Sequence, residues 1–79
     1  MRILIVEDNE GLRTTMRDLL RSMGYEVRGA RSYRKAVKRL TRYKFELVLS
    51  DMELGDGSGF DVLQLARQTY PESCVVLMG

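Results

Sequence analysis

The chain has 79 residues, 44% of them hydrophobic and 30% charged, with one cysteine, no histidine and a formal net charge of +2. This composition is typical of one small globular domain, it excludes a disordered chain, and its weak net charge gives no sign of a polyanionic partner. The composition also excludes Ser/His and Cys/His catalysis and histidine-bound zinc within these residues, and no apolar run is long enough to cross a membrane.

Short apolar runs alternate with helical periodicity along the chain. Residues 2–6 are almost all aliphatic, which predicts a strand buried on both faces. A helix is expected over residues 10–23, capped by Asn9 or by Asp8 and ended by Gly24. The apolar residues that recur at helical spacing in this segment and give one apolar stripe are Leu12, Met16, Leu19, Leu20 and Met23. We expect Met16 and Met23 to be core residues.

Residues 25–30 predict a second strand, and Ser32 is placed to cap a second helix. The apolar side of that helix consists of Ala36, Val37 and Leu40. Residues 28–44 contain eight Arg or Lys residues and no acidic residue. Such a segment is compatible with a nucleic-acid patch, but no base-stacking aromatic pattern is interleaved with the cations. We therefore expect a solvent-exposed helix face and no direct nucleic-acid contact by this segment.

The second half of the chain continues the alternation. Residues 45–49 predict a third strand, and residues 54–59 form a loop rich in glycine. A third helix is expected to begin near Gly59, and a fourth strand over residues 74–78. The apolar residues of this helix are Phe60, Val62, Leu63 and Ala66. Cys74 lies in the last apolar run, which predicts a buried thiol in a reducing compartment and hence a cytoplasmic protein. No membrane partner is expected, because no apolar run is long enough to span a bilayer. Strands that alternate with helices predict a right-handed parallel α/β sheet.

Three carboxylates stand at the ends of two of these apolar runs. Glu7 and Asp8 directly follow the first run, and Asp51 directly follows the third. If both runs are neighbouring parallel strands, the three acids meet at the edge where such sheets bind ligands. Carboxylates this close repel one another and raise one pKa unless a cation joins them, and Mg²⁺ suits oxygen ligands. Glu7 and Asp8 alone are also typical of solvated loop residues or of charges at a helix N-terminus.

The chain resembles the receiver domain of bacterial two-component response regulators. The segments that carry the resemblance are Ile3-Leu4-Ile5-Val6-Glu7-Asp8-Asn9, Leu47-Val48-Leu49-Ser50-Asp51-Met52 and Gly57-Ser58-Gly59-Phe60. It covers residues 1–79 as one partial receiver domain that stops after the fourth strand. The resemblance implies a doubly wound, flavodoxin-like parallel sheet with strand order 2-1-3-4, in which the fifth strand and the last helices are absent.

The resemblance also implies a role for each acid. Asp51 is implied to be the phosphoacceptor, which attacks the phosphorus of a phosphohistidine on a sensor histidine kinase or phosphotransfer protein. Glu7 and Asp8 are implied to hold Mg²⁺ together with Asp51, and Glu53 to contribute its backbone carbonyl. A carboxylate nucleophile can form an acyl phosphate, and phosphoryl transfer requires mainly positioning and charge neutralisation. The expected function is a signalling switch, not an enzyme acting on another substrate.

Departures from the family pattern leave other hypotheses open. Gly55 stands where receivers usually have proline, Gly79 stands where they have a switch Ser or Thr, and the Lys after the fifth strand is missing. These departures motivate a pseudo-receiver, a protein-interaction module that works without phosphorylation. A Mg²⁺-dependent phosphatase of the aspartyl-phosphate type is a weaker hypothesis. We expect a fragment of a longer receiver, or a chain completed by dimerisation or strand exchange, because the fourth strand would form an exposed apolar edge.

Overall fold

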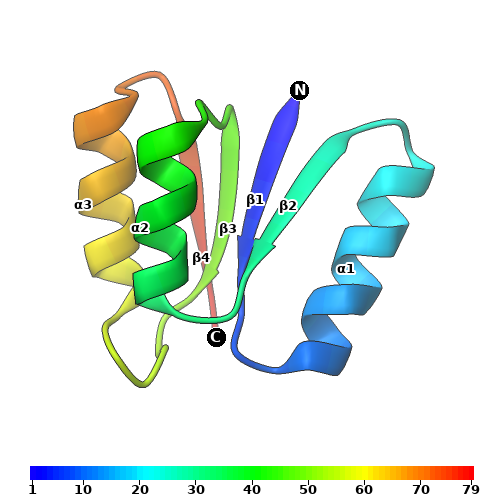
Figure 1. Ribbon diagram of the computed structural model, residues 1–79, viewed down its shortest axis with the longest axis horizontal. Coiled ribbons are helices and arrows are strands. Elements are labelled where there is room, and N and C mark those ends of the chain that lie inside the picture. The colour runs from blue at the N-terminus through cyan, green and yellow to red at the C-terminus, as the bar shows by residue number, and fades with distance from the viewer.

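A parallel four-stranded sheet with helices on both faces forms the fold (Figure 1). The computed structural model describes residues 1–79. The elements in chain order are β1 (Arg2–Val6), α1 (Glu10–Ser22), β2 (Glu26–Ala30), α2 (Tyr33–Arg42), β3 (Leu47–Asp51), α3 (Gly59–Thr69) and β4 (Cys74–Met78). The strand order is β2-β1-β3-β4, and every adjacent pair is parallel. The predicted fold class and strand order are therefore confirmed.

Each helix begins at a polar cap. The Asn9 side-chain oxygen accepts a hydrogen bond of 2.9 Å from the Leu12 backbone N–H, so Asn9 rather than Asp8 caps α1. Ser32 and Ser58 cap α2 and α3 in the same way. None of the three helices has the length and apolar character that a bilayer span requires.

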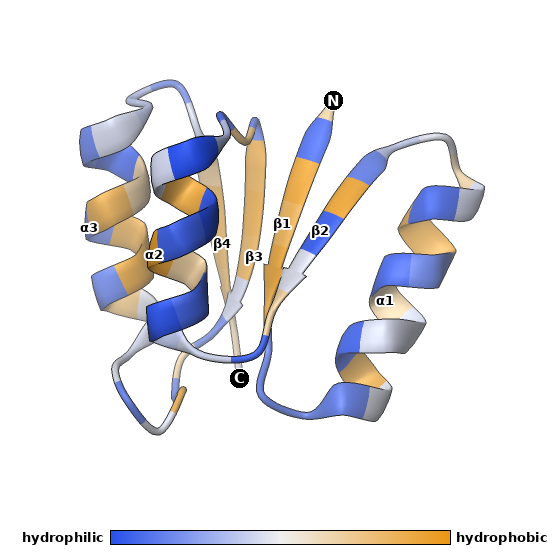
Figure 2. Cartoon of the chain, in the orientation of Figure 1, coloured by the Kyte–Doolittle hydropathy of each residue, from blue (hydrophilic) through white to orange (hydrophobic).

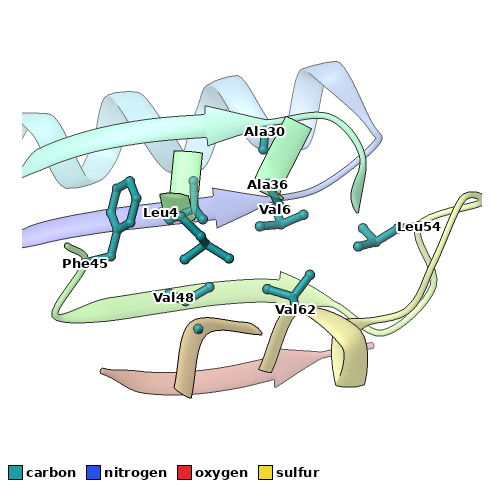
Figure 3. Close-up of a cluster of buried hydrophobic side chains, with 10 residues drawn as sticks. Leu4, Val6, Ala30, Ala36, Phe45, Val48, Leu54 and Val62 are labelled. Atoms are coloured by element: carbon teal, nitrogen blue, oxygen red, sulfur yellow. The ribbon is translucent and has the colours of Figure 1, made fainter. Parts of the chain in front are cut away.

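The main hydrophobic core lies between the sheet and helices α2 and α3 (Figure 3). Its ten buried residues are Leu4, Val6, Ala30, Ala36, Leu40, Phe45, Val48, Leu54, Val62 and Ala66. Phe45 precedes β3 instead of starting it, because the strand begins at Leu47, yet its ring is only 1% exposed. Figure 2 shows hydrophobic colour along most of β1 and β3, the two central strands of the sheet.

Helix α1 covers the opposite face of the sheet and contacts only β1 and β2 (Figure 1). The smaller core on this side consists of Ile3, Ile5 and Val27, with Met16 and Leu20 packed against it. Leu12, Leu19 and Met23 are 48%, 61% and 61% exposed. The prediction that Met23 is a core residue is therefore wrong, and the apolar stripe of α1 is buried only in part. Helix α1 packs on only two strands, which offer too little surface to bury all of its apolar side chains.

Strands β2 and β4 form the two edges of the sheet. No helix covers β4 on the α1 side, and Val76 is 43% exposed there. The expected exposed apolar edge at the fourth strand is therefore confirmed. Cys74, by contrast, is exposed, which contradicts the prediction of a buried thiol. The apolar neighbours of Cys74 in the sequence do not bury it, because the side of β4 on which it lies has no covering layer.

Candidate functional site

Parallel pairing of β1 with β3 brings the predicted acids together. Val6 pairs with Ser50, so Glu7, the residue after β1, and Asp51, the last residue of β3, leave the sheet side by side. One carboxylate oxygen from each of Glu7, Asp8 and Asp51 lies within 4.8 Å of the other two. The predicted juxtaposition is therefore confirmed, while the assignment of these acids as metal ligands and acceptor stays a prediction.

The three carboxylates differ in burial. Glu7 is 5% exposed, Asp51 is half-buried and Asp8 is exposed. Burial raises the pKa of Glu7 above its ordinary value, the N–H of Asn9 opposes this rise through a bond of 3.1 Å to Oε2, and Asp8 and Asp51 reinforce it. The raised pKa therefore reflects first the burial of the Glu7 carboxyl and only then the two neighbouring carboxylates. A hard divalent cation with oxygen ligands fits this donor set.

The backbone around Asp51 fixes the direction of its side chain. Asp51 Oδ1 accepts a hydrogen bond of 3.2 Å from the Glu53 backbone N–H. A Cβ atom at Gly59 would lie 2.6 Å from the Asp51 carbonyl oxygen, so this position accepts only glycine without a shift of the backbone. Helix α3 therefore starts in direct contact with Asp51, the last residue of β3 and the candidate acceptor.

The loop between β3 and α3 borders an open hollow beside the acids. The residues that line the hollow are Asp8, Asp51, Met52, Glu53, Gly55, Ser58, Phe60 and Gly79. Glu53, whose side chain is exposed, thus reaches the predicted site, whereas the buried Glu7 does not line this hollow. Gly55 has a φ of +80°, which proline cannot adopt. The loop therefore takes a turn that depends on glycine at this position.

Two contacts of the site were not predicted from the sequence. The Asp56 carboxylate accepts hydrogen bonds of 2.9 Å from the backbone N–H groups of Tyr33 and Arg34, and these bonds lower the pKa of Asp56. Arg13 Nη1 donates a bond of 2.8 Å to the Glu7 carbonyl oxygen. The first contact joins residues more than twenty positions apart, so no local sequence pattern predicts it. The second contact joins α1 to the end of β1, and basic residues are common on exposed helix faces, so Arg13 does not stand out in the sequence.

Comparison with known proteins gives consistent matches over almost the whole chain. Residues 3–79 match the sequence profile described as "Response regulator receiver domain". The response regulator protein PilR of Pseudomonas aeruginosa is 36% identical over 77 residues, which are 98% of this chain and 17% of PilR. The chain thus spans less than a fifth of the length of that relative.

Two solved structures with the same fold contain bound ligands. Response regulator TrrA of Thermotoga maritima, in complex with Mg²⁺-BeF, has a TM-score of 0.87 and 29% identity over 96% of this chain and 66% of its own. A response regulator of Burkholderia pseudomallei, with a phosphorylated aspartic acid, a calcium ion and citrate, has a TM-score of 0.90 and 29% identity over 96% of this chain and 45% of its own.

Proposed function

Because the chain belongs to the response regulator receiver family, whose domains are signalling domains, we propose that it is the phosphoacceptor switch of a two-component system. In this proposal Asp51 accepts a phosphoryl group from a phosphohistidine. The observation that carries it is the meeting of Glu7, Asp8 and Asp51 within 4.8 Å at one edge of the sheet. The phosphorylated aspartic acid in the Burkholderia relative supports the same chemistry.

The proposed transfer is a displacement at phosphorus. A carboxylate oxygen of Asp51 attacks the phosphorus atom, and a P–O bond forms as the P–N bond to the imidazole breaks. The electron pair of that bond stays on the departing imidazole nitrogen. The Glu53 N–H holds Oδ1 of Asp51, and no protein group bonds Oδ2, which leaves that oxygen free to attack. The product is an acyl phosphate, and its added charge of about −1.5 to −2 shifts the receiver toward an active surface.

A divalent cation would make this approach of two anions possible. Glu7, Asp8 and Asp51 would hold it through their carboxylates, and Glu53 through its backbone carbonyl. Mg²⁺ bound there would neutralise charge on both the carboxylates and the incoming phosphoryl oxygens. The approach of the Glu7, Asp8 and Asp51 carboxylate oxygens to within 4.8 Å of one another supports this assignment, because a cation among them would offset their mutual repulsion.

The phosphoryl donor lies outside these 79 residues in this proposal, because they contain no histidine. A sensor histidine kinase or a phosphotransfer protein would supply the phosphohistidine in the cytoplasm. A second copy of this chain is a further proposed partner, at the β4 edge, where Val76 is 43% exposed.

The structure also favours a second candidate function. Gly79 follows β4 and lines the hollow beside Asp51, and it offers no hydroxyl group to read out a bound phosphoryl group. A pseudo-receiver would bind its partner without phosphorylation. Association that is indifferent both to Mg²⁺ and to Asp51→Asn would favour this alternative.

The main proposal is tested by incubating the chain with acetyl phosphate and Mg²⁺ and recording its intact mass. We expect the native chain to gain one phosphoryl group and Asp51→Asn to gain none. Glu53→Gln is the matched control, because the proposal uses only the backbone of Glu53 and this variant should still be labelled. An unlabelled native chain, or a labelled Asp51→Asn, would refute the proposal.

A further inference from the structure

Positive charge is concentrated in one part of the chain. Residues 13–44, which span most of α1, all of β2 and all of α2, contain eleven of the thirteen basic residues but only two of the eleven acidic ones. The weak net charge of +2 therefore conceals a strongly asymmetric surface. Figure 2 shows that hydrophilic residues dominate the outward side of α2.

The cations of α1 and α2 meet in a groove along the free edge of β2. The groove has a volume of about 250 Å³ and contains no hydrophobic lining residue. Its charged lining consists of Arg13, Arg17, Arg21, Arg28 and Arg39 with one acid, Glu10. Arg13 and Arg39 also line an adjoining hollow together with Lys35. Lys35 and Arg39 in turn line a third hollow along α2. We call this continuous row of hollows the basic groove.

The edge of β2 holds these arginines in place. Arg21 Nη2 donates a hydrogen bond of 2.9 Å to the Val27 carbonyl oxygen, and Arg39 Nε donates one of 3.2 Å to the Gly29 carbonyl oxygen. Val27 and Gly29 are alternate residues of the edge strand, so their carbonyls are not free to pair with an added strand. Each guanidinium has five N–H donors, and most of them remain available to a ligand in the groove.

Protein carboxylates leave most of this charge uncompensated. Of the five arginines that line the first hollow, only Arg17 forms an ion pair, with Asp18. The Arg28 guanidinium carbon lies 4.3 Å from the ring centroid of Tyr43, and its buried Nε has no hydrogen-bond partner. Clustered like charges repel one another, and an anion bound between them would relieve this repulsion.

We propose that the basic groove binds the phosphodiester backbone of a duplex nucleic acid without reading its sequence. Guanidinium groups match phosphate oxygens in bidentate geometry, and a row of cations suits successive phosphates. The groove lacks the apolar centre of a protein interface and the aromatic residues that stack on single-stranded bases. The proposal departs from the expectation drawn from residues 28–44 alone, because the fold adds the arginines of α1 to the same edge.

The test is a fluorescence anisotropy titration of labelled mixed-sequence duplex DNA and duplex RNA with the 79-residue chain. We expect binding that weakens steeply between about 50 and 200 mM salt. The variant Arg17→Gln/Lys35→Gln removes two groove cations whose side chains hold no main-chain carbonyl. It should weaken DNA binding on the order of tenfold and lower the slope of log affinity against log salt by about 2. The control Gln64→Glu/Arg67→Gln changes the net charge equally on α3 and should bind like the native chain.

The outcomes separate the proposal from its rivals. Loss of binding in the groove variant but not in the control supports it, and the preferred duplex identifies DNA or RNA as the source of the phosphodiester. Absence of binding by the native chain at 50 mM salt, or equal loss in both variants, overturns it. Tighter binding of polyglutamate than of either duplex also overturns it, in favour of an acidic protein. Thermal unfolding checks that both variants are folded. If Arg17→Gln/Lys35→Gln does not fold, the variant Lys35→Gln/Lys38→Gln takes its place.

Discussion

The carbonyl oxygen of Asp51 occupies the space that a side chain at Gly59 would need. A Cβ atom at Gly59 would lie 2.6 Å from this oxygen and 3.1 Å from the Cα atom of Met52. Both atoms belong to the backbone, which cannot move aside as a flexible side chain can. The contact ties the first residue of α3 to the last residue of β3, so the position of the candidate acceptor depends on a residue eight positions further along the chain.

Gly59→Ala should therefore destabilise the chain by about 1–3 kcal/mol, as expected for an inserted methyl group with no space to occupy. Urea unfolding measures the change. Gly11→Ala is the matched control, because its Cβ would meet nothing closer than 3.5 Å and the position lies in α1. It should be neutral or stabilising by up to about 1 kcal/mol. Equal effects of the two substitutions would contradict the close approach.

Mg²⁺ should stabilise the native chain through the three clustered acids. A ligand at 100 times its dissociation constant adds about 2.7 kcal/mol to the free energy of unfolding. Asp8→Asn should lose this gain, yet it should be more stable than the native chain in the presence of a chelator, because it removes one of three mutually repelling charges. Thermal unfolding with Mg²⁺ and with EDTA tests both signs. Glu53→Gln should keep the Mg²⁺ response, and its loss there would contradict the backbone role.

Asp56 should make the stability of the chain depend on pH in the acid range. The N–H groups of Arg34 and Tyr33 lower the pKa of its carboxyl below the ordinary value of 3.8. A lowered folded-state pKa contributes stability that is fully present above the unfolded-state pKa and is lost as pH falls through the folded-state value. Asp56→Asn lacks this contribution, so its free energy of unfolding should be lower than that of the native chain. The difference should be largest near neutral pH and should shrink below about pH 5. Urea unfolding across this range is the measurement, and a deficit that does not change with pH would contradict the assignment.

The two sides of the sheet should respond differently to the same truncation. Leu40 of α2 is 5% exposed, and Leu40→Ala should cost about 2–5 kcal/mol. Leu19 of α1 is 61% exposed, and Leu19→Ala should change the free energy of unfolding by less than about 0.5 kcal/mol. Chemical denaturation of both variants compares them directly. A large cost at Leu19 would mean that another surface covers α1 in solution.

Much of the fold follows from local patterns. The aliphatic run at residues 2–6 and the cap at Asn9 predict β1 and the start of α1, since a continuous aliphatic run favours a strand and a cap bonds the backbone of its own helix. The meeting of Glu7, Asp8 and Asp51 also follows from the sequence, because acids that end two adjacent parallel strands emerge at one edge.

Other features depend on which elements pack together, and no local pattern encodes that choice. The hydrophobic residues of α1 form one apolar stripe at helical spacing, but the helix rests on two strands only, and Leu12, Leu19 and Met23 stay exposed. The cap that Asp56 places on α2 joins residues that are distant along the chain. The arginines of α1 and α2 share one groove for the same reason. Residue spacing determines the helices, the strands and the acids at the strand ends. Which side chains are buried and which charges lie close together is decided only by the tertiary structure, because both depend on surfaces from distant segments.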